Sequence, residues 1–334
     1  MSSLAPGTRI GGYRILRTLS DAGHFSLVYL AEPPRGEGAV ALKENFPAGA
    51  AYRARDGATL RARDRDVFAW ALERFEREAE FLRRHRHPGL VHVLGPPIRE
   101  NGTSYMPLEY LTGGSLRRRI ERRGAESEAQ VRTWLDPVLA ALESIEGVGT
   151  SHLDLSPDNI LFRGTGEPVL VDFGSARIGG VAPTRGTRMI TNCGYSAPEK
   201  LSRTSRDIDA RADVYSVAAL VNFAMTGREP SPAQDRLTGT PALPPKVAAR
   251  RRGSPAFLAA IDKGFAIAIA DRHRGAAAFR RALAPGEHRA SAGGSDISAP
   301  APIADPDEFR RRAGVAALVA FALLCLMSIT LILV

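Results

Sequence analysis

The 334-residue chain is poor in cysteine, lysine and aromatic side chains. Its two cysteines, Cys193 and Cys325, are too few and too unfavourably placed for a disulfide framework or a zinc site. Only four of the 45 basic residues are lysines, at 43, 200, 246 and 263, so the net charge of +9 comes mainly from arginine. Because neither interleaved aromatic residues nor a nucleic-acid motif accompanies this charge, we expect solvated surface and no nucleic-acid partner. A hydrophobic fraction of 44% and a charged fraction of 24% exclude wholesale disorder.

The N-terminus lacks the apolar segment of a secretory signal, whereas the C-terminus carries a long uncharged run. Residues 313–334 read AGVAALVAFALLCLMSITLILV, which is 22 positions without a charge. As a helix this run is about 33 Å long, which matches a hydrocarbon core of about 30 Å. A buried core helix is the alternative, but it fits poorly with this length behind a linker. The pattern predicts one C-terminal transmembrane helix over residues 313–334.

Three arginines at 310–312 directly precede this run, and the positive-inside rule places the residues before them in the cytoplasm. We therefore expect a tail-anchored, single-pass membrane protein that contacts the lipid bilayer through 313–334 and is inserted after translation. The preceding segment, 284–309, is rich in Ala, Pro, Gly and Ser, which is typical of a flexible linker.

Upstream of the linker, the hydrophobic pattern changes from strand-like to helix-like. Short apolar runs predict strands at Tyr13–Thr18, Leu27–Ala31, Val40–Lys43, Leu90–Leu94 and Ser104–Glu109. Apolar residues at alternating steps of four and three predict helices over Phe68–Leu82 and Val131–Ile145. A hairpin is expected between Ile160–Phe162 and Val169–Val171. A β-rich lobe followed by a helical lobe predicts an α+β, two-lobed enzyme with its site in the cleft.

Two motifs in the middle of the chain carry the chemistry. Residues Ser151–Phe162 read SHLDLSPDNILF, and VLVDFGSAR follows. Together they resemble the protein-kinase catalytic loop H-R-D-x-x-x-x-N and the magnesium-binding D-F-G. The resemblance implies that Asp154 is the catalytic Asp and that Asn159 and Asp172 are metal ligands. The residue types suit this role, because Mg²⁺ prefers oxygen ligands and a carboxylate can accept the proton of a substrate hydroxyl.

The nucleotide-binding parts of a kinase have counterparts nearer the N-terminus. Val40-Ala-Leu-Lys43 resembles the strand motif V-A-I-K, whose lysine holds the α- and β-phosphates, and Lys43 is the only lysine among the first 199 residues. A solvated charge at a strand end is the alternative. By the same resemblance, Gly23 and Val28 belong to the glycine-rich loop over the phosphates. Leu108 to Leu111 resemble the gatekeeper and hinge, where Glu109 and Leu111 would bind adenine.

Glu78 resembles the helix glutamate that pairs with the phosphate-binding lysine. The apolar stripe Phe75-Ala79-Leu82 places Glu78 at the border of the packed face. Its neighbours Glu76 and Glu80 are alternatives, and all three would otherwise form a solvated face. The resemblance further implies scaffold roles for three residues of the helical lobe, which are Glu199 of A-P-E, Asp213 and Arg272.

The resemblance covers about residues 13–283, and it is closest to bacterial eukaryotic-like Ser/Thr kinases in the stretches LKENFPAGAAYRARDG, NGTSYMPLEY and TNCGYSAPEK. It implies a bilobal protein-kinase fold that uses ATP and Mg²⁺ and phosphorylates Ser or Thr hydroxyls of proteins. Together with the expected anchor, it places the kinase domain at the cytoplasmic face, where tethering favours membrane-proximal substrates.

Several positions depart from the family pattern. The glycine-rich loop keeps only Gly23, and Asp21 brings a carboxylate close to the expected phosphates, while Ser26 replaces a glycine. Leu153 replaces the arginine before the catalytic Asp, and Ser156 replaces the lysine that contacts the γ-phosphate. The loss of one charge-assisted contact is worth about 1.5–3 kcal/mol. A nucleotide-binding pseudokinase with a regulatory or scaffold role, or a scaffold that binds no nucleotide, is therefore an alternative to an active kinase.

Thr184, Thr187 and Thr191 lie between D-F-G and A-P-E, where phosphorylation can order a segment against arginines. Because Leu153 removes the usual receiving arginine, we expect phosphorylation there to change activity less than in an arginine-containing kinase. The sequence identifies no substrate, no activating signal and no oligomeric state.

Overall fold

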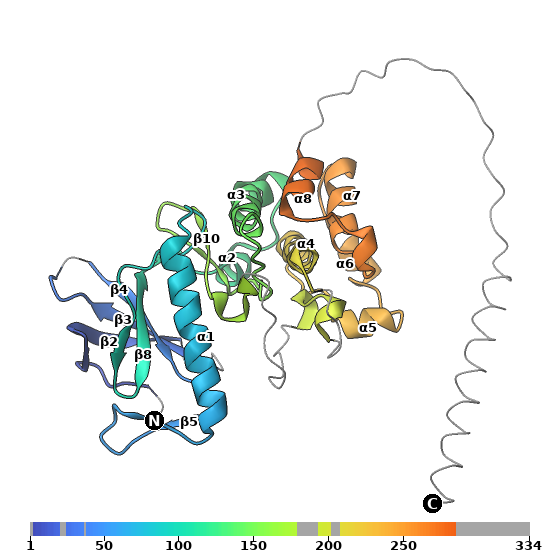
Figure 1. The fold of residues 1–334 in the computed structure, drawn as a ribbon. Helices are drawn as coiled ribbons and strands as arrows, with labels where there is room; N and C mark the ends of the chain where they lie inside the picture. Colours follow the sequence, from blue (N-terminus) through green and yellow to red (C-terminus); the bar gives the residue numbers. More distant parts are fainter. Residues whose placement is uncertain (1–2, 21–24, 37, 179–192, 202–207, 285–334) are drawn as a thin grey trace, which may run out of the picture. The chain divides into compact units, whose positions relative to one another are not determined.

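The computed structural model describes residues 3–20, 25–36, 38–178, 193–201 and 208–284 (Figure 1). The described residues all belong to one compact unit, residues 1–285. The expected transmembrane helix at 313–334 and all but the first residue of the expected linker lie outside the described residues. No helix in the described part of the chain is long and apolar enough to cross a membrane.

An antiparallel sheet forms the N-terminal lobe, with strand order β1-β2-β3-β4-β8-β7 (Figure 1). Four of the predicted strands are present in it, each slightly longer than its apolar run. The strands are β1 (Arg9–Ile10), β2 (Tyr13–Ser20), β3 (Ser26–Glu32), β4 (Val40–Asn45), β7 (Ile98–Glu100) and β8 (Thr103–Glu109).

Helix α1 (Arg65–Arg84) packs against this sheet and contains the predicted helix 68–82. Asp64 caps its N-terminus, where the carboxylate accepts hydrogen bonds from the amides of Asp66 and Val67. Its buried face includes Phe75, Ala79 and Leu82, the apolar stripe seen in the sequence, and also Glu78. The helix therefore carries one acidic side chain into the interior between the sheet and the helical lobe.

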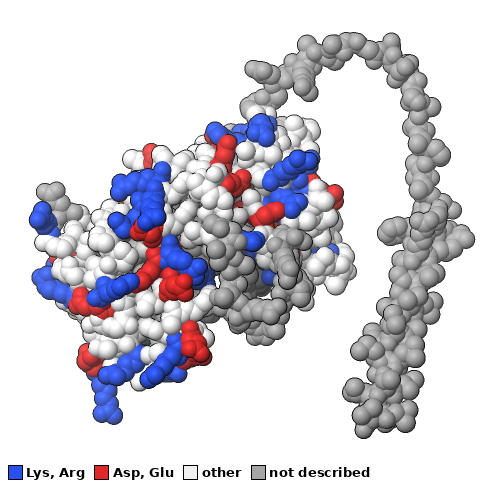
Figure 2. All heavy atoms as spheres, in the orientation of Figure 1, with Lys and Arg blue, Asp and Glu red and all other residues white. Residues whose placement is uncertain are grey.

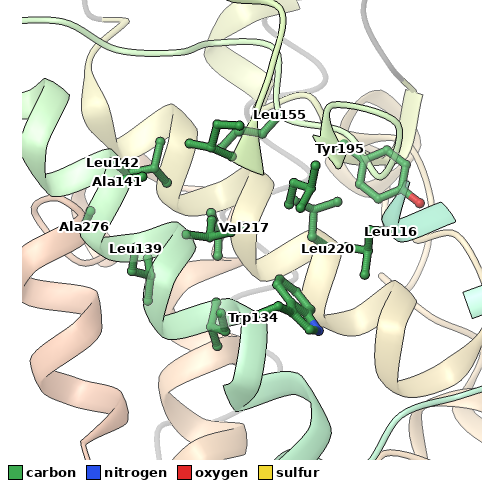
Figure 3. Packing of buried hydrophobic residues seen from close by; sticks show 14 of the residues in the cluster. Leu116, Trp134, Leu139, Ala141, Leu142, Leu155, Tyr195, Val217, Leu220 and Ala276 are labelled. Carbon is green, nitrogen blue, oxygen red and sulfur yellow. The ribbon is translucent and has the colours of Figure 1, made fainter. Parts of the chain in front are cut away.

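The C-terminal lobe is helical and is built around α4 (Ala210–Thr226), in which every residue from Ala212 onward is buried. Helix α3 (Glu128–Glu146) packs beside α4, and Figure 3 shows Trp134, Leu139 and Leu142 of α3 facing Val217 and Leu220 of α4. The remaining helices are α2 (Leu116–Arg123), α5 (Ala233–Leu237), α6 (Pro245–Ala248), α7 (Pro255–Gly264) and α8 (Ala276–Leu283). One hydrophobic cluster runs from β4, α1 and β8 into this lobe, so the two lobes share a core.

Two predictions about strands need correction. The run Leu90–Leu94 is not a strand, because it makes only isolated bridges, Leu90 to Leu170 and Val93 to Leu108. The expected hairpin is present, but β9 (Ile160–Phe162) pairs with β10 (Pro168–Leu170), one residue earlier than predicted. A second hairpin, β5 (Ala51–Arg53) with β6 (Leu60–Ala62), was not predicted, because three-residue strands are too short to show a period.

This second hairpin is tied to the sheet by Glu44, which is completely buried on β4. The Glu44 carboxylate accepts hydrogen bonds from the hydroxyls of Tyr29 and Tyr105, at 2.6 and 3.0 Å, and Arg53 donates to both of its oxygens. Successive side chains of a strand point to opposite faces of the sheet, so this network and the side chain of Lys43 lie on opposite faces. It fixes the strand that carries the lysine.

Charged side chains of both signs are interspersed over the face shown in Figure 2. Several charged residues of the described chain form ion pairs, for example Arg99 with Glu76 at 2.7 Å and Arg280 with Asp136 at 2.7 Å. On this face the excess of arginine is spread among carboxylates and does not form a single basic stripe. The arrangement agrees with the interpretation of the charge as solvated surface.

Candidate active site

The candidate site is organised around Lys43, which is only 5% exposed. Its Nζ donates to both carboxylate oxygens of Glu78, at 2.7 and 3.0 Å, and to Oδ1 of Asp172 at 3.0 Å. These residues come from β4, from α1 and from the segment after β10, so the cluster joins the two lobes. The backbone amide of Phe173 also donates to Glu78, at 3.0 Å, which locks D-F-G against α1.

The structure distinguishes Glu78 from its acidic neighbours. Glu78 is 3% exposed and faces Lys43, whereas Glu76 pairs with Arg99 and Glu80 pairs with Arg83 and Arg84 on the surface. A solvated strand-end position for Lys43 is therefore wrong.

The cluster perturbs the protonation of its members. Burial disfavours the Lys43 ammonium, but the charges of Asp172 and Glu78 outweigh this and raise the pKa of Lys43 well above its usual value. The charge of Lys43 in turn lowers the pKa of Asp172 to about 2, so this carboxylate is ionised at neutral pH. An ionised, half-exposed carboxylate beside a held cation is suited to bind a metal ion that carries phosphates.

The loop before Asp154 is fixed by a carboxylate from the helical lobe. Buried Asp213 accepts hydrogen bonds from the amides of His152 and Leu153, both at 2.7 Å. Leu153 has a φ of 63°, a left-handed conformation that a leucine adopts only when its surroundings enforce it. Burial lowers the pKa of His152 to about 4, so the imidazole is neutral and its role is structural.

Asn159 and Asp172 form a donor set that fits Mg²⁺. The side-chain amide of Asn159 donates to the carbonyl oxygen of Asp154 at 2.7 Å, which leaves its side-chain oxygen as the metal-binding atom. The amide of Val171 donates to the carbonyl oxygen of Asn159 at 3.1 Å and so links this loop to Asp172. No group of three His, Cys, Asp or Glu side chains suited to a metal is found among the described residues. Mg²⁺ commonly completes its shell with water and substrate phosphates, so one carboxylate and one amide suffice.

The side chain of Glu109, the first residue of the expected hinge, has a structural role. The Glu109 carboxylate binds Arg163 at 2.7 and 3.1 Å and accepts from the amide of His92 at 2.9 Å. The group that Glu109 would present to adenine is therefore its backbone carbonyl. Val28 lies opposite Lys43 in the β3–β4 register, and both Val28 and Leu111 belong to or border the shared core, which provides an apolar surface for a base.

Arg74 is a site residue that the sequence analysis did not identify. It lies one helical turn before Glu78, donates to Ser175 Oγ at 3.1 Å, and stacks on the rings of Phe25 and Trp70 at 5.5 and 5.0 Å. It thus connects the start of β3 with the residue after D-F-G. The spacing of four from Glu78 was the available signal.

The end of the A-P-E segment is anchored as the motif implied. Arg272, whose side chain is fully buried, donates to both carboxylate oxygens of Glu199 at 2.7 and 3.0 Å. Asp21 and Gly23 of the glycine-rich loop, and Thr184, Thr187 and Thr191, lie outside the described residues. Ser156 is 4% exposed and Leu153 is 1% exposed, so both are buried. Neither side chain carries a charge.

Comparisons with known proteins agree with this geometry. The family profile described as "Protein kinase domain" matches residues 23–242. The chain is 32% identical over 287 residues to the "Serine/threonine-protein kinase PknD" of Mycobacterium tuberculosis (strain ATCC 25618 / H37Rv). The matched region covers 81% of this chain and 39% of that protein. It is 32% identical over 228 residues to the "Serine/threonine-protein kinase pkn3" of Myxococcus xanthus, with coverages of 64% and 41%. The chain thus spans about two fifths of the length of these relatives.

A solved structure titled "PpkA-294 apo form" has the same fold. It superposes with a TM-score of 0.71 at 29% identity, covering 85% of this chain and 100% of that chain.

Proposed function

The chain belongs to the protein kinase family, and we propose that it is a Ser/Thr protein kinase that transfers the γ-phosphoryl group of ATP to protein hydroxyls. The observation that carries the proposal is the direct contact of Lys43 with both Glu78 and Asp172, at 2.7 and 3.0 Å. A kinase needs its phosphate-binding lysine and its metal-binding aspartate in place together before it can act. The Ser/Thr kinase relatives support the choice of hydroxyl.

Each residue has a defined task in the proposed reaction. The oxygen of a substrate Ser or Thr bonds to the γ-phosphorus while the bond from that phosphorus to the bridging oxygen of ADP breaks. Asp154 orients the hydroxyl and accepts its proton. Lys43 holds the α- and β-phosphates, and Asn159 and Asp172 would bind Mg²⁺, which supplies charge that neutralises the phosphate oxygens.

The direct test is transfer of label from γ-labelled ATP to a generic protein substrate by the full-length chain in detergent. We expect transfer in Mg²⁺, its loss on addition of EDTA, and its recovery when Mg²⁺ is restored in excess. The two protein ligands, one carboxylate and one amide, would bind the metal together with the phosphates of ATP, so removal of the metal should stop transfer. If ATP and Mg²⁺ raise the melting temperature without any transfer, the chain is a pseudokinase. If they leave the melting temperature unchanged, it is a scaffold.

We also propose that residues 313–334 anchor the kinase in a membrane, with the catalytic unit at the cytoplasmic face. The 22 uncharged residues and the arginines at 310–312 support this proposal. A linker of this composition keeps the catalytic unit within tens of ångströms of the bilayer, on a flexible-chain length of about 5–6 Å times the square root of the residue number. Membrane proteins and proteins recruited there are then the favoured substrates.

Two arginines placed in the middle of this run should release the protein from membranes. Each arginine at the centre of a transmembrane helix costs about 2.5–3.5 kcal/mol of insertion free energy, so Leu323→Arg combined with Leu324→Arg is expected to move the protein from the membrane fraction to the supernatant. The matched control adds the same two charges to the linker, as Ala299→Arg and Ala301→Arg, and should remain with the membranes. Wild-type protein in the supernatant would refute the anchor.

A further inference from the structure

Lys200, the residue after A-P-E, lies in the interior of the helical lobe. It belongs to a short 3-10 turn, Pro198–Leu201, and is only 7% exposed. Lysine is almost never buried to this degree without a partner. Here the partner is the catalytic loop, because the Lys200 ammonium donates a hydrogen bond to the carbonyl oxygen of Leu153.

This contact acts on the peptide group directly before Asp154. The oxygen of that peptide group is held by Lys200, and its N–H, which belongs to Asp154, donates to Nδ1 of His152 at 3.3 Å. The preceding two amides are held by Asp213. Because a peptide group is planar, fixing both of its polar atoms fixes this plane up to the Cα of Asp154. The side-chain amide of Asn159 holds the next carbonyl, that of Asp154, at 2.7 Å, so the two contacts together limit the direction in which the Asp154 side chain leaves the backbone.

The same contact brings positive charge to a loop that carries none of its own. Leu153 and Ser156 stand where the family pattern has basic side chains, whereas Lys200 approaches the loop from a different segment. Burial lowers the pKa of Lys200, while the negative charges of Asp154, Asp213 and Glu199 favour its ammonium form. The cation therefore lies among the carboxylates that surround the catalytic loop.

We propose that Lys200 is a positioning residue for phosphoryl transfer, which holds the Leu153 carbonyl and thereby aims Asp154 in a loop that lacks basic residues at 153 and 156. The inference rests on the proposed kinase activity, but the contact between Lys200 and Leu153 can be tested whether or not the chain is active. The competing interpretation is that Lys200 only fastens the A-P-E segment to the lobe.

Steady-state kinetics of Lys200→Met in the full-length protein separate these interpretations. Methionine has a similar shape and removes a buried charge, so the fold is expected to persist. Misplacement of a reacting group by about 1 Å lowers rates by about 100-fold, so we expect kcat to fall by about tenfold to 100-fold while the KM for ATP changes by less than about twofold. The matched control is Lys263→Met, at an exposed lysine of α7, which should leave both constants unchanged.

Hydrogen exchange of the amides of residues 152–154 provides the second measurement, which does not require turnover. In Lys200→Met we expect these amides to exchange at least about tenfold faster than in wild type or in Lys263→Met. If Lys200→Met does not fold, Lys200→Leu, which also has no hydrogen-bond donor, carries the same two measurements. An unchanged exchange rate, or an unchanged kcat in an active wild type, overturns the proposal. A wild type without turnover refutes the kinase activity instead, and exchange alone then decides the role of Lys200.

Discussion

Replacing Asp154 with asparagine is expected to lower kcat by about 10²–10⁴-fold, the range that a positioned general base contributes. The amide has nearly the same shape, but it cannot accept the proton of the substrate hydroxyl. Nucleotide binding should persist, because Lys43, Asn159 and Asp172 are unchanged. We therefore expect ATP with Mg²⁺ to raise the melting temperature of Asp154→Asn as much as that of wild type.

The control for this substitution is Asp158→Asn in the same loop. Asp158 is largely exposed, and its carboxylate pairs with Arg117 at 2.7 Å. Loss of a surface pair costs about 0–1 kcal/mol of unfolding free energy. The substitution leaves Asp154, Asn159 and Asp172 unchanged, so kcat should stay close to that of wild type. Equal turnover by wild type and Asp154→Asn would show that Asp154 does not act as the base.

Much of this site could be predicted because its signals are local. Asp154, Asn159 and Asp172 all lie within nineteen residues of sequence, so their spacing can be recognised directly. The stripe on α1 favoured Glu78 over Glu76 and Glu80, which stayed open as alternatives, because helical periodicity decides which side of a helix is buried. The structure then provides the distances that the spacing alone could not.

The parts that were missed depend on contacts between distant segments. The Glu109 carboxylate is engaged by Arg163, which is 54 residues away, so a hinge residue expected to bind adenine has a side chain that binds the protein. The contact of Lys200 with Leu153 spans 47 residues. The only signal for Lys200 in the sequence was that it is one of four lysines in an arginine-rich chain. The periodicity of apolar residues does not predict which distant residue a buried lysine side chain contacts.

The second large effect is expected for Lys43→Met, which should lower both activity and stability. Removal of one preorganised charge at the phosphates costs about 10²–10³-fold in rate. Breaking a buried pair by removing one partner costs about 3–5 kcal/mol of unfolding free energy, because Glu78 is left as an uncompensated buried carboxylate. The two losses have different causes, and a second substitution separates them.

Adding Glu78→Gln to Lys43→Met should restore most of the stability and none of the activity. Glutamine keeps an acceptor for the amide of Phe173 but removes the buried charge. Denaturant unfolding at pH 7 and kinetic assays on the single and double variants measure the two effects. If the double variant is no more stable than Lys43→Met, the Lys43–Glu78 pair does not carry the stability assigned to it.

The loss of stability in Lys43→Met should also depend on pH. Burial raises the pKa of Glu78, and without the lysine the charge of Arg74 opposes this effect, while the charge of Asp172 adds to it. A carboxyl whose pKa is higher in the folded state than in the unfolded state binds more protons when folded, so lowering the pH through the range between these two values stabilises the folded protein.

The difference in unfolding free energy between wild type and Lys43→Met is therefore expected to shrink as the pH falls from 7 toward the unfolded pKa of Glu78, near 4.5. In wild type the charge of Lys43 lowers the pKa of Glu78 against the effect of burial, so the gain from this group should be smaller than in Lys43→Met. The low pKa of Asp172, about 2, makes its ion pair with Lys43 weaken only at still lower pH. A difference that stays constant between pH 7 and pH 5 would mean that Glu78 is not the group left uncompensated.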